Sequence, residues 1–329
     1  MHLIKHKDYF YLKKMKKKKI LIIGSGVLGA YLSQIFLKKS YEVYVGTRIL
    51  RKNYKNYKYL KIQKKIKFFR LNFLNKNEVE KKIKTLKPEI IYYFSGQSSI
   101  YKSFKESKAT LDSNFYGAQI FLNIIYKNKL KIKFFKSNSA YIFKTLKQEK
   151  NLKYKFVKPN SPYVEAQIKA FKVVKKFRKL GVNCYSLIFF NIESPLKPNS
   201  FILNKVSNFI KFKKKNILKL GNIDLIRDFS WAPEIMRGVF YILNSKPQDI
   251  VFGSGKSFYL RQMIKFFFDL KKMNYKEHIK IDKSLLRKNE KKNISISEIK
   301  KNQLLKKKNW IPKIYGKKLV KKLYYSKQL

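Results

Sequence analysis

Cysteine and histidine are scarce in this chain of 329 residues. The single cysteine, Cys184, excludes a disulfide within the chain and fits a reducing cytoplasm, where we expect the protein to reside. Because Cys184 lies in an apolar run, we interpret it as a buried structural thiol and not as a nucleophile. The three histidines, His2, His6 and His278, are too far apart to predict a metal site.

Long apolar runs are also missing. None reaches the roughly 20 residues that a membrane-spanning helix needs, and no signal peptide is evident, so we expect no membrane partner. Residues 1–15 are predicted to be a disordered extension. Met15 precedes four lysines and the first predicted strand, and is an alternative start of translation.

Acidic residues number 19 against 78 basic ones, a formal net charge of +59. Only eight of the 78 are arginine, so 70 are lysine, and these are spread along the whole chain. Because arginine forks dominate the reading of base edges, the composition does not predict specific binding of nucleic acid. Lysine, asparagine, isoleucine, phenylalanine and tyrosine all have A/T-rich codons, so genome composition is the simpler explanation. Weak, salt-sensitive attraction to polyanions is expected as a side effect.

Three of the twelve glycines have G-x-G-x-x-G spacing between an apolar, β-branched stretch at residues 20–23 and a helical apolar pattern. The first glycine allows a tight turn, the second lets backbone N–H groups approach a pyrophosphate, and the third lets helix and strand pack closely. The helix N-terminus attracts phosphates. The pattern predicts a dinucleotide site; a glycine-rich turn without ligand is the alternative. Its residues are Gly24, Ser25, Gly26, Val27, Leu28 and Gly29.

The second predicted strand, at residues 41–45, ends close to Arg48. An acidic residue at this place binds the ribose hydroxyls of NAD, whereas an arginine suits the 2′-phosphate of NADP. We therefore expect NADP as the cofactor. NAD is the alternative, because an arginine in so basic a chain could be incidental.

Strands and helices alternate along the first part of the chain, which predicts an α/β fold with a doubly wound parallel sheet of the Rossmann type. Further strands are predicted at residues 66–69, 89–94, 132–135 and 182–190, and helices at residues 78–86, 109–126 and 161–180. Ser161 and Pro162 suit the N-cap and first residue of the last helix. We expect residues 16–190 to bind the cofactor, and residues 191–329 to form mainly a smaller C-terminal substrate lobe, interleaved with the first domain.

Several motifs resemble those of the extended short-chain dehydrogenases/reductases, and most closely the GDP-mannose 4,6-dehydratases. The resemblance covers roughly residues 20–320. It rests on residues 94–99 (FSGQSS), 161–163 (SPY), 190–195 (FNIESP), 220–224 (LGNID) and 227–229 (RDF), on Arg287-x-x-Glu290 and on Trp310-x-Pro312. It implies an NADP-dependent enzyme acting on a nucleotide-diphosphate sugar similar to GDP-mannose. A homodimer or homotetramer is also expected.

The resemblance assigns roles to individual residues. It implies a catalytic group of Tyr163, Gln167, Asn138 and Ser139. It adds Asn72, Ser95, Gly96, Gln97 and Tyr163 to the cofactor site, and places Lys197 in a loop near a cofactor. It assigns the nucleotide sugar to Asn191, Glu193, Arg227, Arg287 and Glu290. For Arg227 and Asp228, a surface ion pair is the alternative.

Two departures from the family's pattern, at Gln167 and Ala140, affect catalysis. Gln167 stands where the family has a lysine, one helical turn after Tyr163 and so on the same helix face. A nearby cation favours the ionised tyrosine, and Gln167 carries no charge. Lys169 is two residues further on and points elsewhere. Ala140 replaces the glutamate that takes the C5 proton during dehydration.

Other departures affect binding. Asn138 replaces a threonine that hydrogen-bonds sugar O4, although Ser137 or Ser139 could serve if the register shifts. Ile23 replaces the family's usual first glycine, and Asn72 replaces an aspartate that meets the adenine. We therefore predict that 4,6-dehydration is very slow or absent. The alternatives are a nucleotide-sugar 4-ketoreductase or epimerase, which tolerates Ala140, and a catalytically silent binder of NADP and nucleotide sugar.

Overall fold

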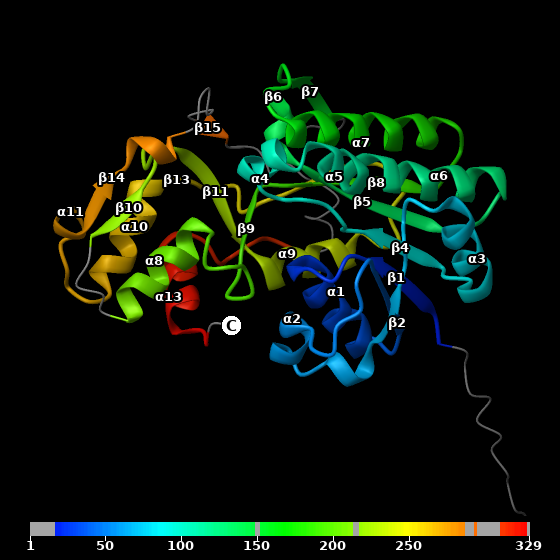
Figure 1. The fold of residues 1–329 in the computed structure, drawn as a ribbon, viewed down its shortest axis with the longest axis horizontal. Helices are drawn as coiled ribbons and strands as arrows, with labels where there is room; N and C mark the ends of the chain where they lie inside the picture. The colour runs from blue at the N-terminus through cyan, green and yellow to red at the C-terminus, as the bar shows by residue number, and fades with distance from the viewer. Residues whose placement is uncertain (1–16, 149–151, 213–216, 287–292, 295–309, 328–329) are drawn as a thin grey trace, which may run out of the picture.

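The computed structural model describes residues 17–148, 152–212, 217–286, 293–294 and 310–327. Its largest element is a seven-stranded parallel sheet with the order β12-β8-β5-β4-β1-β2-β3 (Figure 1). The strands are β1 (Lys19–Ile23), β2 (Glu42–Thr47), β3 (Lys67–Arg70), β4 (Ile90–Tyr93), β5 (Lys133–Ser139), β8 (Cys184–Phe189) and β12 (Asp249–Phe252). The order reverses between β1 and β4, and sheets of this kind bind ligands at that point.

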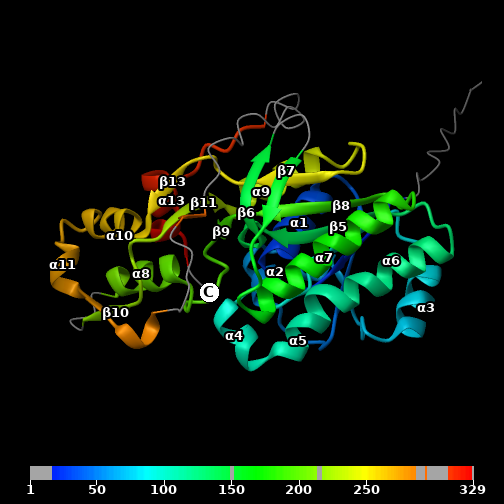
Figure 2. The ribbon, with the colours of Figure 1, turned by 90° about the horizontal axis from the view of Figure 1, so that it is seen from above.

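Helices cover both faces of the sheet, as predicted for a doubly wound fold (Figures 1 and 2). One face carries α1 (Val27–Lys38), α2 (Lys55–Tyr59) and α9 (Ala232–Tyr241). The other carries α3 (Lys76–Leu86), α4 (Ile100–Lys105), α5 (Ser107–Leu111), α6 (Gly117–Lys127) and α7 (Pro162–Lys179). The apolar run of β1 serves both layers, because Ile20 and Ile22 lie in one core while Leu21 and Ile23 lie in the other.

The structure departs from the predicted elements at three places. Strand β5 continues to Ser139, so residues 137–139 belong to the strand instead of following it, because they pair with β8. The helix expected over residues 109–126 is divided into α5, the π-helical turn η2 (Asp112–Tyr116) and α6. Strand β12 was not predicted, because its four residues depend on pairing with β8 at the edge of the sheet.

The second half of the chain forms a smaller lobe. Its elements are β9 (Asn191–Glu193), α8 (Ile202–Lys211), β10 (Leu218–Leu220), β11 (Ile226–Trp231), β13 (Ser257–Tyr259), α10 (Leu260–Asp269), α11 (Tyr275–His278), β14 (Ile279–Ile281), η4 (Lys283–Leu285), β15 (Asn293–Ile294) and α13 (Gly316–Tyr325). Helices α8, α10 and α13 share a core that includes Val206, Phe267 and Leu323. The lobe meets the carboxyl end of β5 directly, since Arg227 Nε donates to Tyr141 Oη at 3.0 Å.

The two halves are interleaved, because α9 packs on α1 and β12 joins the large sheet. The remaining elements of the first half are η1 (Gln63–Lys65), η3 (Ala140–Ile142) and the antiparallel hairpin of β6 (Phe143–Gln148) and β7 (Leu152–Phe156). Within the described part of the chain, no helix combines the length and the apolar character needed to span a bilayer. The predicted extension at residues 1–15 lies outside the described residues.

Candidate active site

The glycine-rich turn joins β1 to α1 at the point where the strand order reverses. Gly24 has a φ of +105°, and a Cβ there would lie 2.9 Å from the backbone nitrogen of Ser95 in the loop after β4. A Cβ at Gly29 would lie 2.6 Å from the carbonyl oxygen of Gly24, whereas Gly26 faces open space. Because no side chain caps the N-terminus of α1, its first N–H groups remain available to an anion. The turn therefore fits the diphosphate of a dinucleotide.

The predicted cofactor residues of β2 and β3 lie at the same edge of the sheet, because Thr47 pairs with Arg70. Arg48 follows β2, is exposed, and has its guanidinium 5.5 Å from the ring centroid of Phe73. The Asn72 side chain accepts a hydrogen bond from the Leu74 nitrogen at 3.2 Å, so it shapes the turn after β3. Arg48 therefore places an exposed cation at the edge of the sheet where binding of the NADP 2′-phosphate would need one.

The loop after β4 is held against η2. A Cβ at Gly96 would lie 2.2 Å from Asn114 Oδ1, so this position needs glycine. Asn114 Nδ2 donates to the carbonyl oxygen of Gln97 at 3.2 Å, and Gln97 Nε2 donates to Glu106 at 3.1 Å. Ser95 of this loop therefore lies close to Gly24 of the glycine-rich turn, while Gly96 and Gln97 are held by Asn114, a residue that the sequence patterns did not reveal.

Tyr163 occupies the first turn of α7. Ser161 is the N-cap, with its Oγ accepting from the Val164 nitrogen at 3.3 Å, and Pro162 follows as predicted. Burial raises the pKa of Tyr163 to about 12, and the nearby Ser139 side chain offsets part of that rise. Tyr163 therefore keeps its proton at neutral pH. Of the two serines proposed as substitutes for the altered position 138, Ser139 Oγ accepts from the Tyr141 nitrogen at 3.2 Å, and Ser137 Oγ donates to the Tyr93 carbonyl at 3.3 Å.

Gln167, on the same helix as Tyr163, lies in a buried network of three amides. Its Nε2 donates to Asn114 Oδ1 at 2.8 Å, and its Oε1 accepts from Asn138 Nδ2 at 3.3 Å. Asn138 Nδ2 also donates to the main-chain oxygen of Gln167 at 3.1 Å. Gln167 is 5% exposed and Asn138 is 3% exposed. The structure thus places these two predicted catalytic residues in an internal network, with their amides turned to each other.

Asn114 sits in the π-helical turn η2, a distortion that is frequent at functional sites. Its Nδ2 also donates to the Thr110 carbonyl at 3.0 Å. In the sequence, the only signal was an asparagine on the apolar side of an otherwise amphipathic helix. Because its partners lie 17 and 53 residues away, local pattern could not reveal this role.

Ala140 follows β5 in the short helical turn η3 and is buried. Its methyl group cannot accept a proton. Lys169, the lysine of α7 nearest in sequence to Gln167, pairs with Glu165 at 2.6 Å, as expected for a side chain pointing elsewhere. In the folded site, Ala140 therefore provides no base, and Lys169 does not replace the lysine that is missing at position 167.

The predicted substrate residues meet where β9 pairs with β11. Asn191 pairs with Phe229, two residues after Arg227. Arg227 is 3% exposed, and its guanidinium lies 5.5 Å from the ring centroid of Tyr141. Asp228 is fully buried and accepts hydrogen bonds from the 254–255 turn. The alternative of a surface ion pair is therefore wrong for Arg227 and Asp228.

Glu193 is 3% exposed and accepts from Lys197 Nζ at 2.9 Å through Oε1. Its Oε2 has no hydrogen-bond partner among the described residues. Arg287 and Glu290, the other predicted substrate residues, lie outside the described residues. Cys184 is buried, as predicted, and burial raises the pKa of its thiol to about 12.

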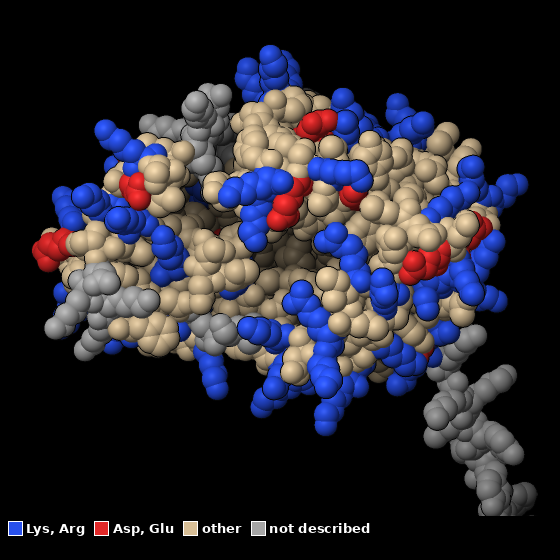
Figure 3. All heavy atoms as spheres, viewed as in Figure 1, with Lys and Arg blue, Asp and Glu red and all other residues tan. Residues whose placement is uncertain are grey.

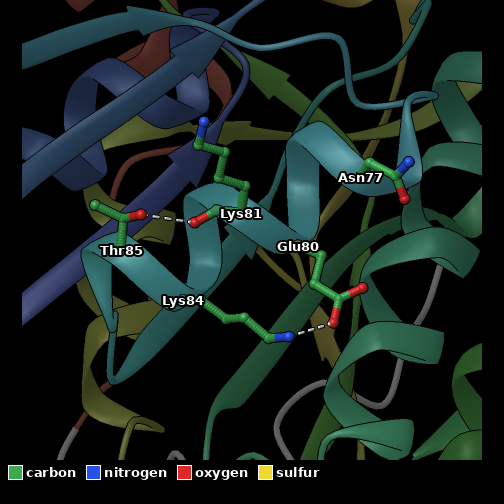
Figure 4. A pocket seen from close by; sticks show the side chains of 5 residues that line it. All are labelled: Asn77, Glu80, Lys81, Lys84 and Thr85. Atoms are coloured by element: carbon green, nitrogen blue, oxygen red, sulfur yellow. Dashed lines mark hydrogen bonds and ion pairs between the residues drawn. The ribbon is translucent and has the colours of Figure 1, made fainter.

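The face of the molecule seen in Figure 3 is rich in basic side chains. Figure 3 shows lysine and arginine side chains over the whole viewed face, and a recess between the sheet domain and the smaller lobe. A separate, open hollow lies over α3 and is lined by Asn77, Glu80, Lys81, Lys84 and Thr85 (Figure 4). There Lys84 pairs with Glu80 at 2.8 Å. This hollow lies on a single helix away from Tyr163, so we do not assign the reaction to it.

Comparison with known families gives a match over most of the chain. The family described as GDP-mannose 4,6 dehydratase matches residues 21–323. GDP-mannose 4,6 dehydratase 1 of Arabidopsis thaliana is 26% identical over 326 residues, covering 93% of this chain and 89% of that protein. The GDP-mannose 4,6 dehydratase of Homo sapiens is 25% identical, covering 74% of this chain and 70% of its own.

Solved structures share the fold. The dTDP-glucose 4,6-dehydratase of Bacillus anthracis, in complex with NAD, superposes with a TM-score of 0.77 at 16% identity and covers 93% of this chain and 96% of its own. The UDP-glucose 4-epimerase of Thermotoga maritima, with UDP-glucose, has a TM-score of 0.78 at 17% identity. The match covers 93% of this chain and 98% of that chain. The predicted fold class is confirmed.

Proposed function

This chain belongs to the GDP-mannose 4,6-dehydratase family, and from that premise we propose that it is an NADP-dependent enzyme that reduces the C4 carbonyl of a nucleotide-diphosphate sugar instead of dehydrating the sugar. The observation that carries the proposal is the environment of Tyr163. This tyrosine is buried and protonated at neutral pH, and no carboxylate stands at Ala140.

The residues of the glycine-rich turn suit the cofactor. Its backbone N–H groups at Ser25 and Gly26 would face the diphosphate, and Arg48 would face the 2′-phosphate, since a guanidinium binds phosphate through paired donors. When bound, NADPH supplies the hydride that reduction of a carbonyl needs. The preference for NADP over NAD rests on Arg48.

For the sugar nucleotide, Arg227 and Asn191 would hold the diphosphate and ribose. Arg227 is kept in place by Tyr141, which accepts from its Nε at 3.0 Å and presents its ring to the guanidinium. Arg287 and Glu290 would complete the nucleotide site. The family's match over residues 21–323 supports a nucleotide sugar as the ligand class, with GDP as the first nucleotide to test.

The protonated state of Tyr163 and the lack of a base at Ala140 favour reduction over dehydration. Tyr163, with a pKa of about 12, is in the acid form that reduction requires, and it can give its proton to O4 as the carbonyl becomes a hydroxyl. Dehydration would need the opposite state, an ionised Tyr163, and then a second base for the C5 proton. Ala140 supplies no base, so the elimination step has no acceptor at that position.

The test is incubation with NADPH carrying deuterium at the transferable position and a panel of nucleotide-linked sugars, including 4-keto sugars, read by mass spectrometry. We expect one deuterium in the reduced sugar and its loss in Tyr163→Phe. Efficient dehydration of GDP-mannose by the unaltered protein would contradict the proposal. Binding of NADP and nucleotide sugar without turnover of any of them would favour a silent binder.

A further inference from the structure

Lys136 on β5 is a lysine with no exposed surface. Its Nζ donates to the main-chain oxygen of Ser137 at 2.5 Å and lies 5.6 Å from the ring centroid of Tyr93 on β4. Among the described residues, no carboxylate forms an ion pair with it. A buried, unpaired cation destabilises a protein, so its retention requires an explanation beyond packing.

Lys136 faces the layer that contains Tyr163. Successive side chains of a strand alternate between faces, so Phe134, Lys136 and Asn138 share one face of β5. Phe134 packs in the core that includes Val173 and Val174 of α7, and Asn138 donates to Gln167 of the same helix. The Cα of Lys136 therefore lies about 7 Å along β5 from the Cα of Asn138, the member of the amide network that this strand supplies.

The titratable groups on the neighbouring elements leave the charge of Lys136 uncompensated. They include Tyr93 on β4, Cys184 on β8, Asp112 on η2, and Tyr163, Glu165 and Lys169 on α7, whereas Tyr185 of β8 packs in the core on the opposite face of the sheet. Asp112 pairs with Lys108 at 3.6 Å, and Glu165 pairs with Lys169. Burial lowers the pKa of Lys136 to about 7, so the charged and neutral forms are both populated near neutral pH.

We propose that Lys136 supplies, from strand β5, the positive charge that helix α7 lacks at Gln167, and that this charge assists proton donation by Tyr163. The inference rests on the proposed function. Lys136 is a positioning residue, because it does not touch the substrate. As Tyr163 donates, its O–H bond breaks, the proton joins O4, and the electron pair stays on the phenolate oxygen. A buried cation nearby stabilises that phenolate, and the low dielectric of the interior strengthens the effect.

The decisive experiment moves the positive charge from position 136 on β5 to position 167 on α7. We compare the unaltered protein with Lys136→Met, Gln167→Lys and the double variant in steady-state turnover of a nucleotide-linked 4-keto sugar from pH 6 to pH 9. Lys133→Met is the matched control, because Lys133 lies on the same strand and its Nζ bonds the Leu243 carbonyl at 2.9 Å. Circular dichroism and thermal melting establish that each variant is folded.

In the unaltered protein we expect kcat to fall as pH rises through about 7, where Lys136 loses its proton. Lys136→Met should lower kcat at pH 6.5 by about tenfold or more and abolish this pH dependence. The double variant should recover most of the lost kcat, because the lysine that replaces Gln167 restores a cation one helical turn from Tyr163. Unchanged kcat and pH profile in Lys136→Met, or a folded double variant without recovery, would overturn the proposal.

A second measurement does not depend on turnover. In protein labelled with ¹³C at tyrosine Cζ, the resonance of Tyr163 is assigned with Tyr163→Phe and titrated in Lys136→Arg and Lys136→Met. We expect the permanent charge of arginine to lower the pKa of Tyr163 by at least about one unit relative to methionine, a tenfold effect. Equal values would reject the role of Lys136 even if the protein reduces a keto sugar. A shift without turnover of any sugar would reject only the proposed function.

Discussion

The hydroxyl of Tyr31 lies 3.0 Å from Ser194 Oγ and joins two segments that are 163 residues apart. Tyr31 is on α1, the helix that begins at the glycine-rich turn, and Ser194 follows β9 in the segment that carries Asn191 and Glu193. Burial raises the pKa of Tyr31 to about 12, so this hydrogen bond keeps its proton throughout the physiological range. The contact connects the proposed cofactor site with the proposed substrate site.

Tyr31→Phe should therefore weaken the coupling between the two ligands. Loss of one hydrogen bond costs about 1 kcal/mol, so we expect NADP to strengthen nucleotide-sugar binding about fivefold less in the variant than in the unaltered protein. Isothermal titration with and without NADP measures this ratio. Tyr126→Phe, at an exposed position on α6, is the control. An unchanged ratio in Tyr31→Phe would show that the contact is only structural.

Arg48→Ala should weaken NADP binding without a comparable loss for NAD. A charged hydrogen bond contributes about 1.5–3 kcal/mol, so we expect roughly a ten- to hundredfold rise in the Kd for NADP. Titration of both cofactors by protein fluorescence provides the measurement. Arg261→Ala, which removes an exposed arginine paired with Asp224 in the smaller lobe, is the control. Equal losses for NADP and NAD, or tighter binding of NAD by the unaltered protein, would contradict the assignment.

Arg227→Ala should reduce thermal stabilisation by GDP-sugars. Arg227 is buried beside Tyr141, so its guanidinium is already ordered before a diphosphate binds. We expect the unaltered protein to show a rise in Tm at millimolar nucleotide sugar and the variant to lose most of that rise. Each rise is measured from the Tm of the same protein without ligand, which corrects for the stability that Arg227→Ala loses through reduced packing. If no nucleotide sugar stabilises the unaltered protein, the ligand class is wrong.

Dehydration of GDP-mannose should be very slow or absent in the unaltered protein and should rise in steps on substitution. Gln167→Lys places a cation beside Tyr163, and Asn138 Oδ1, which has no partner among the described residues, can accept from it. General-base catalysis contributes about a hundred- to ten-thousandfold, and this is the range that the variant can regain. Gln167→Lys/Ala140→Glu adds the base for C5. Deuterium from solvent at C5 should appear mainly in this double variant, and an ordinary dehydratase rate without substitution would disprove the prediction.

Lys136→Met should stabilise the protein at neutral and lower pH. Burial lowers the pKa of Lys136 from 10.5 to about 7 in the folded state, so between these values the unfolded chain binds more protons and the free energy of unfolding rises with pH. Below pH 7 the full penalty applies, on the order of a few kcal/mol. Urea unfolding from pH 6 to pH 10 should give a difference between the two proteins that shrinks as pH rises. A constant difference would place the pKa of Lys136 elsewhere.

Several elements of this protein could be predicted from its sequence, because they depend on residues that are close together in the chain. The β-branched run before Gly24, the glycine spacing and the Ser161-Pro162 cap each act over a few residues, so the strand, the turn and the start of α7 could be predicted. The departures at Gln167 and Ala140 were also visible, because they needed only a comparison of residue types at known spacing. The burial of Cys184 followed from its apolar neighbours.

Only the tertiary structure decided which polar groups meet inside the sheet domain. The amides of Asn138, Asn114 and Gln167 come from β5, η2 and α7, and their contact depends on how those layers pack. The same holds for the buried charge of Lys136, which the sequence presented as one lysine among 70. Short-range patterns fix the direction of a side chain within its own element. The distance between side chains on different elements follows from the packing of the whole chain, and the chemistry of Tyr163 depends on those distances.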